Sequence, residues 1–121
     1  MSMNNNEKFV AKTEINNGSC TVFLTGELDL SVAQEFRLVM EPLVEDANLD
    51  LTINLRDLKY IDSTGIGILL SILKARHSMS TQFLVQDVPP QIQKLFDMTG
   101  ISKFFESIEN SEVGKDRLTN D

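Results

Sequence analysis

Apolar residues change their spacing several times along the chain, and each change predicts a new element. Near the start, residues 9–15 and 19–25 alternate as half-buried strands do, and the Asn-Asn-Gly stretch between them predicts a β-hairpin. A third alternating run covers residues 51–55, and residues 82–87 form a short fourth run. The pattern therefore predicts four strands.

Helical spacing appears between these strands. After Ser31, apolar side chains recur every three or four positions, and Ser31 followed by Gln34 matches a capping box that starts a helix there. Pro42 inside this helix predicts a bend on its solvent side or a break. Residues 64–79 are apolar almost all round, which favours a helix buried on most sides. Residues 89–100 open with two prolines and end at a glycine, as a shorter third helix would.

The predicted elements follow the order β-β-α-β-α-β-α. Two right-handed β-α-β crossovers that advance in one direction leave their helices on the same face of a sheet. The alternating strands agree, because a sheet covered on both faces has continuous apolar runs. We therefore expect an α/β fold with a small mixed β-sheet and helices packed mainly on one face. One domain at 9–109 would lie between a flexible N-terminus at 1–8 and a polar C-terminal tail or loose helix at 110–121.

Composition and charge narrow the range of partners. With 41% hydrophobic and 24% charged residues, the chain has an ordinary globular composition. Its net charge of −7 argues against nucleic acid and against an anionic membrane, because both call for a basic face. The single Cys20 excludes an internal disulfide, and the longest apolar stretch is far shorter than the ~20 residues of a membrane span. No signal-peptide pattern opens the chain, so we expect a cytoplasmic protein.

Asp62, Ser63 and Thr64 stand where a strand turns into the most buried helix. In such sheets, ligands gather at the carboxyl ends of the strands. The first N–H groups of a helix lack intrahelical partners and its dipole is positive there, so the turn suits an anion. The same three residue types are also preferred helix caps, and Gly65 and Gly67 are equally compatible with simple close packing.

Catalytic interpretations of this turn lack groups that they need. A serine hydrolase needs a base beside Ser63, but the only histidine, His77, lies about 20 Å along the predicted helix at ~1.5 Å per residue. An aspartic protease needs a second carboxylate, and a phosphoaccepting Asp57 needs clustered acids for Mg²⁺. No phosphate-binding loop and no metal-spaced Cys/His set occurs. We therefore expect no enzyme activity, no cofactor and no metal site.

A phosphoryl group on Ser63 gives the turn a different role. It adds about −1.5 to −2 charge, which the free N–H groups of a helix start accommodate without unfolding the chain. A protein partner that covers the turn would have to bury an unpaired anion, which costs several kcal/mol, whereas about 1.4 kcal/mol weakens binding tenfold. Phosphorylation of Ser63 would therefore release such a partner. Thr64 is the weaker candidate for the same modification.

Three separated stretches resemble one bacterial family in order and spacing. They are TGELDLSVA, INLRDLKYIDSTGIGILLS and QIQKLFDMTGISKFF, and they resemble the STAS-domain anti-sigma factor antagonists over residues 9–108. The resemblance implies a STAS-like fold and a partner-switching role in transcription regulation, in stress response or sporulation. The unphosphorylated protein would bind an anti-sigma factor that is also a serine kinase, and so free a sigma factor. The kinase would inactivate it on Ser63, and a serine phosphatase would reset it.

The resemblance also assigns residues to a partner-binding surface. It makes Ser63 the phosphoacceptor and places Asp29 on an acidic loop that meets the kinase, although Asp29 is nearly as well explained as a helix cap or solvated carboxylate. A STAS scaffold subunit of a larger stress-signalling assembly is the alternative. The predicted partner-binding residues are Asp29, Asp62, Ser63, Thr64, Gly65, Ile66 and Gly67.

Overall fold

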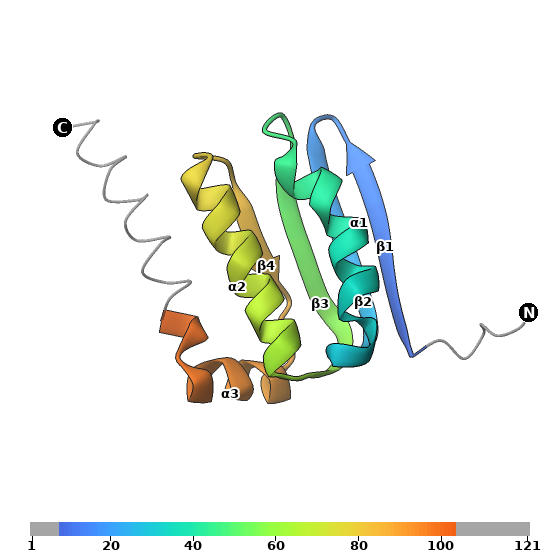
Figure 1. The fold of residues 1–121 in the computed structure, drawn as a ribbon, viewed down its shortest axis with the longest axis vertical. Coiled ribbons are helices and arrows are strands. Elements are labelled where there is room, and N and C mark those ends of the chain that lie inside the picture. Colours follow the sequence, from blue (N-terminus) through green and yellow to red (C-terminus); the bar gives the residue numbers. More distant parts are fainter. Residues whose placement is uncertain (1–7, 104–121) are drawn as a thin grey trace, which may run out of the picture.

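The computed structural model describes residues 8–103, which form a four-stranded sheet with helices against it (Figure 1). The strands are β1 (Phe9–Asn16), β2 (Ser19–Leu28), β3 (Asp50–Ile61) and β4 (Phe83–Gln86). The helices are α1 (Ala33–Glu45), α2 (Ser63–Ser78) and α3 (Pro90–Thr99), and a 3₁₀ turn, η2 (Leu30–Val32), precedes α1. The strands lie in the order β1-β2-β3-β4, with β1 antiparallel to β2 and the other two pairs parallel. This confirms the predicted mixed sheet and order of elements.

The helices α1 and α2 lie on the same face of the sheet and contact each other (Figure 1). Both begin at the same end of the molecule, and α3 crosses that end. The core lies between these helices and the strands, where the alternating apolar residues of β2 and β3 are buried; these include Cys20, Val22, Leu24, Leu51, Ile53 and Leu55. The layout places the start of α2 at an exposed end of the molecule.

The turn between β1 and β2 has the geometry that its sequence predicts. Asn16 pairs with Ser19, so only two residues form the loop. Asn17 and Gly18 both have positive φ, at 51° and 81°. A two-residue hairpin requires this left-handed backbone, which asparagine and glycine adopt most readily. The predicted hairpin is confirmed.

β3 is longer than the five alternating residues that predicted it. Its register against β2 shifts twice, because Phe23 and Thr25 pair with Asn54 and Asp57, and a second extra residue follows Leu58. Each extra residue moves the buried face by one position, so the later buried side chains no longer alternate with the earlier ones. The strand therefore continues to Ile61, beyond the alternating run at 51–55 that predicted it.

The start of α1 differs from the predicted capping box. Asp29 caps the preceding η2 turn by accepting a hydrogen bond from the Ser31 N–H at 2.9 Å, while α1 itself begins at Ala33 without a side-chain cap. The Ser31 hydroxyl donates to the same carboxylate at 2.7 Å, so it does not cap the helix, and the box with Gln34 is wrong. Pro42 lies within α1 on an exposed position and does not break the helix.

Arg76 is fully buried at the far end of α2. Its guanidinium donates to the carbonyl oxygens of Val44 at 2.9 Å and Asp46 at 3.1 Å, and also to those of Leu49 and Gln82. Burial lowers its pKa, and nearby acidic side chains partly offset that effect. This arginine therefore joins the end of α1 to the turn before β4.

The third helix follows its sequence prediction. Pro90 occupies the first turn of α3, and Gly100 ends the helix with a left-handed backbone at φ 85°. Ile101, directly after this glycine, is buried. Residues 104–109, the predicted tail at 110–121 and residues 1–7 of the N-terminal stretch lie outside the described residues.

Candidate functional site

Asp62 organises the turn between β3 and α2. One carboxylate oxygen, Oδ1, accepts the Gly65 N–H at 2.9 Å and caps α2. The other, Oδ2, accepts the Leu30 N–H at 3.1 Å, and the Asp62 N–H bonds the Leu28 carbonyl oxygen at 3.2 Å. Asp62 therefore joins the start of α2 to the turn that precedes α1. The predicted strand-to-helix turn is present, and Asp62 is its cap.

Ser63 and Thr64 are the first two residues of α2, but they differ in exposure. Ser63 is exposed, whereas Thr64 is half-buried. The N–H groups of Gly65 and Ile66 bond to Asp62. The N–H groups of Ser63 and Thr64 belong to the first turn of the helix, where N–H groups have no intrahelical acceptors. The Ser63 side chain thus stands at the positive end of a sixteen-residue helix, in reach of solvent.

The two glycines of this helix start have different environments. A Cβ on Gly65 would lie 2.7 Å from a side-chain carbon of Ile61 and 2.8 Å from the Leu28 carbonyl oxygen, so only glycine fits there. A Cβ on Gly67 would have nothing within 4 Å, and this residue is exposed. Close packing therefore explains Gly65, but it does not explain Gly67. Ile66 is half-buried between them.

Asp29 lies beside this turn but is already engaged within the chain. Its carboxylate accepts hydrogen bonds from the Ser31 N–H and hydroxyl and forms an ion pair with Lys8. The hydrogen bond from Lys8, followed by that from Ser31, lowers the pKa of Asp29. Its side chain is only 18% exposed. Asp29 is therefore a cap and an ion-pair partner in the free chain, with limited surface to offer a second protein.

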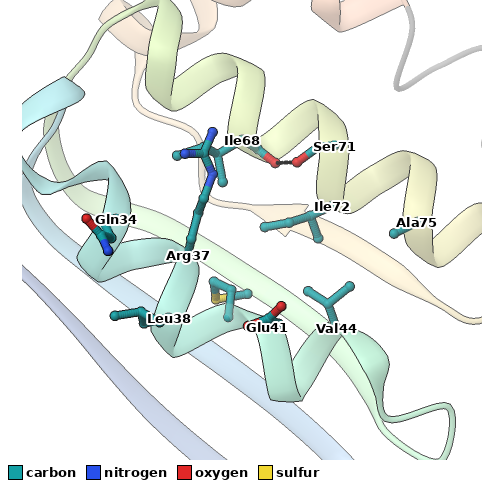
Figure 2. Close-up of a pocket in the computed structure, with 10 residues that line it drawn as sticks. Gln34, Arg37, Leu38, Glu41, Val44, Ile68, Ser71, Ile72 and Ala75 are labelled. Atoms are coloured by element: carbon teal, nitrogen blue, oxygen red, sulfur yellow. Dashed lines mark hydrogen bonds between the residues drawn. The ribbon is translucent and has the colours of Figure 1, made fainter.

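A separate groove of about 400 Å³ runs between α1 and α2 (Figure 2). Ile68 and Ile72 line it from α2, and Arg37 extends from α1 toward Ile68. Charged and apolar side chains share its walls, and Glu41 lies on the same helix as Arg37. None of the predicted partner-binding residues lines this groove. It is distinct from the turn that carries Ser63.

Within residues 8–103, the structure shows how potential metal-binding side chains, His77 and the apolar helices are arranged. Within residues 8–103, no three His, Cys, Asp or Glu side chains gather closely enough to hold a metal ion. His77 lies in α2, fourteen residues beyond Ser63, and is half-buried. In the same part of the chain, no helix has the length and apolar character needed to cross a membrane.

Sequence analysis missed two residues of this site. Lys8 was assigned to the N-terminal segment, yet its Nζ donates to Asp29 and to the Ser31 hydroxyl at 2.9 Å. Leu30 was one apolar residue among many, but the residue is 72% exposed and its N–H bonds Asp62. The only signal for Leu30 in the sequence was its position: it is an apolar residue that directly follows the Glu-Leu-Asp stretch and does not fit the helical spacing. No local pattern could pair Lys8 with a residue 21 positions away.

Comparisons with known proteins agree with this geometry. The STAS domain model matches residues 10–114. A Staphylococcus aureus protein named anti-sigma-B factor antagonist is 33% identical over 88 residues, which are 73% of this chain and 82% of the relative. An anti-sigma factor antagonist from Mycobacterium paratuberculosis superposes with a TM-score of 0.69 at 22% identity, covering 79% of this chain and 81% of the other.

A further solved structure is that of the Bacillus cell fate determinant SpoIIAA in its phosphorylated form. It superposes with a TM-score of 0.63 at 18% identity and covers 84% of this chain and 99% of its own. At this identity the likeness concerns the fold. Together, the domain match and the sequence relatives confirm a regulatory protein and not an enzyme. The chain belongs to the STAS-domain family of anti-sigma factor antagonists.

Proposed function

We propose that the unphosphorylated chain binds an anti-sigma factor through the surface around the start of α2, and thereby frees a sigma factor. The observation that carries the proposal is the position of Ser63: exposed, at the first residue of α2, beside a carboxylate that fixes the turn. An anti-sigma factor is the partner class that the names of the relatives imply. Such a regulator acts in the cytoplasm.

Phosphorylation of Ser63 is the proposed off-switch. The partner, acting as a serine kinase, would transfer the γ-phosphoryl group of ATP to Ser63 Oγ, with release of ADP and of the hydroxyl proton. The solved relative in phosphorylated form supports a phosphorylated state in this fold. Free N–H groups at the start of α2 would meet the new anion, so the fold would persist. The partner would instead face a buried, unpaired charge and dissociate, until a serine phosphatase removes the group.

Substitutions at Ser63 test this proposal. An anti-sigma factor kinase from the same genome is mixed with wild type, Ser63→Ala and Ser63→Glu, and affinities are measured by calorimetry. Ser63→Ala should bind like wild type and stay bound when ATP is added. Ser63→Glu should bind at least tenfold more weakly, because its carboxylate costs more than about 1.4 kcal/mol in the interface. Ser71→Glu, at an exposed position farther along α2, is the matched control and should leave the affinity unchanged. Equal affinity of wild type and Ser63→Glu would refute the proposal.

A further inference from the structure

Lys8 links the first strand to the Asp29 turn. Its Nζ donates hydrogen bonds to Asp29 and to the Ser31 hydroxyl. Its backbone position is fixed as well, because the Lys8 carbonyl oxygen accepts the Glu27 N–H at 2.9 Å. This approach requires a glycine at 26, where an added Cβ would lie 2.0 Å from that same oxygen. The ammonium group is therefore held at the turn, while the Lys8 side chain remains 42% exposed.

The Asp29 turn and the Ser63 turn form one charged cluster. The Leu30 N–H, next to Asp29, bonds the Asp62 carboxylate at 3.1 Å, and Ser63 follows Asp62 directly. The pKa of Lys8 is raised first by its hydrogen bond to Asp29, and the negative charge of Asp62 also raises it. The Lys8 ammonium is therefore already attracted by the carboxylate that precedes Ser63.

We propose that Lys8 is the counter-cation of a phosphoryl group on Ser63. It pairs with Asp29 while Ser63 carries a free hydroxyl, and it turns to the phosphoryl group once that group is attached. The inference rests on the proposed function, because it takes Ser63 as the phosphoacceptor. Phosphoserine carries about −1.5 to −2 charge and three acceptor oxygens, more than the single charge of Asp29. The stem of lysine is flexible, and exposed ion pairs contribute little to stability, so the exchange is feasible.

The exchange changes the partner-facing surface at two places. The phosphoryl group adds negative charge at Ser63, and Asp29 simultaneously loses the cation that balances it. Asp29, without its cation, and a phosphoryl group that stays net negative beside Lys8 then stand at the end of the molecule where α1 and α2 both begin (Figure 1). A partner that fits the unphosphorylated surface meets both of them. Lys8 would thus extend the effect of one modification from α2 to the Asp29 turn.

The test places phosphoserine at position 63 during translation and follows its phosphorus-31 NMR signal against pH. A nearby cation favours the dianion, so the second phosphate pKa should be about 0.5 pH units lower in the parent than in Lys8→Gln. Lys8→Arg should restore the low value. Lys12→Gln is the matched control, because Lys12 is an exposed lysine of the adjoining strand β1 that pairs with Glu14 instead. Identical pKa values in the parent, Lys8→Gln and Lys12→Gln would overturn the inference.

A second measurement needs no substitution. The side-chain NMR signal of Lys8 should shift between the unmodified and the phosphoserine-63 protein, while that of Lys12 should not; an unmoved Lys8 signal would also overturn the inference. Both experiments install the phosphoryl group without a kinase. A low phosphate pKa together with unimpaired partner binding would therefore contradict the proposed function and leave the role of Lys8 intact. Partner release together with an unchanged phosphate pKa in Lys8→Gln would contradict the role of Lys8 and leave the proposed function intact.

Discussion

Gly65 and Gly67 show how neighbouring residues of one motif serve different ends. Gly65 is buried against Leu28 and Ile61, so its lack of a side chain serves the fold. Gly67 faces open space in the free protein. A glycine inside a helix costs about 0.5–1 kcal/mol relative to alanine, and no contact of the described residues offsets that cost. The proposed partner surface would account for this glycine, because a partner could approach its backbone closely.

Alanine substitution should separate the two glycines. Gly65→Ala should destabilise the protein by about 1–3 kcal/mol, because the new methyl group overlaps the Leu28 carbonyl and the Ile61 side chain. Gly67→Ala should stabilise it by about 0.5–1 kcal/mol and weaken partner binding. Urea unfolding followed by circular dichroism measures the stability change of both variants. Calorimetry with the anti-sigma factor measures the affinity of Gly67→Ala for the partner. Unchanged affinity of Gly67→Ala would leave that glycine without a role in the interface.

Because the pKa of Asp29 is lowered, we expect the stability of the protein to depend on pH. Lys8 and Ser31 lower this pKa in the folded protein, below the value of about 3.9 expected in the unfolded chain. A group of this kind contributes stability above the unfolded pKa and loses that contribution as the pH falls through the folded pKa. Asp29→Asn should therefore be less stable than wild type at pH 7, and this difference should shrink as the pH falls below the unfolded pKa of about 3.9. Urea titrations at a series of falling pH values measure the difference, and a constant difference would contradict the prediction.

Among the elements of the fold, Arg76 of α2 joins the end of α1 to the turn before β4 through hydrogen bonds. Four backbone carbonyl groups, from the end of α1 to the turn before β4, share this one guanidinium. Its position on the buried face of α2 follows the spacing of Ile72 and Leu73. The sequence marks it only as an arginine within an apolar helix. Its acceptors lie on other elements, so helical spacing alone does not reveal the contact.

Removal of this guanidinium should damage the fold more than any surface charge does. Arg76→Met removes the hydrogen bonds of a buried guanidinium to four backbone carbonyl groups, at about 1.5–3 kcal/mol for each bond to a charged group before relaxation, so a loss of about 3 kcal/mol or more is expected. Arg56→Met, at an exposed position on β3, should change stability by less than about 0.5 kcal/mol. The midpoints of urea unfolding compare the two variants. Similar midpoints would show that water replaces the guanidinium at no cost.

Strand β3 marks the limit of pattern-based prediction for elements. Alternation identified residues 51–55 because Leu51, Ile53 and Leu55 share the buried face. The two extra residues of β3 then place Leu58 and Ile61 on that face at a spacing of three. A bulge is defined by the neighbouring strand, so the strand's own sequence does not reveal it.

At the scale of the whole molecule, the fold was predictable because its rules are local and directional. Spacing fixes the type of each element, and the right-handed crossover fixes the face that the helices occupy. The turn at Asp62 and Ser63 followed from the same pattern. The connections of that turn did not, because Leu30 bonds Asp62 from 32 positions earlier and Lys8 bonds the neighbouring Asp29 from 21 positions earlier. The site therefore includes more residues than the sequence motif that predicted it.

We propose that a single phosphoryl group on Ser63 expels the partner while the fold persists. One time course tests it most directly: the complex with the anti-sigma factor kinase receives ATP, and native mass spectrometry follows the complex and the phosphorylated chain together. The predicted result is one added phosphoryl group, mapped to Ser63, that appears as the complex disappears, with an unchanged circular dichroism spectrum of the released chain. A complex that survives full phosphorylation of Ser63, or that dissociates with the group on another residue, would contradict the claim.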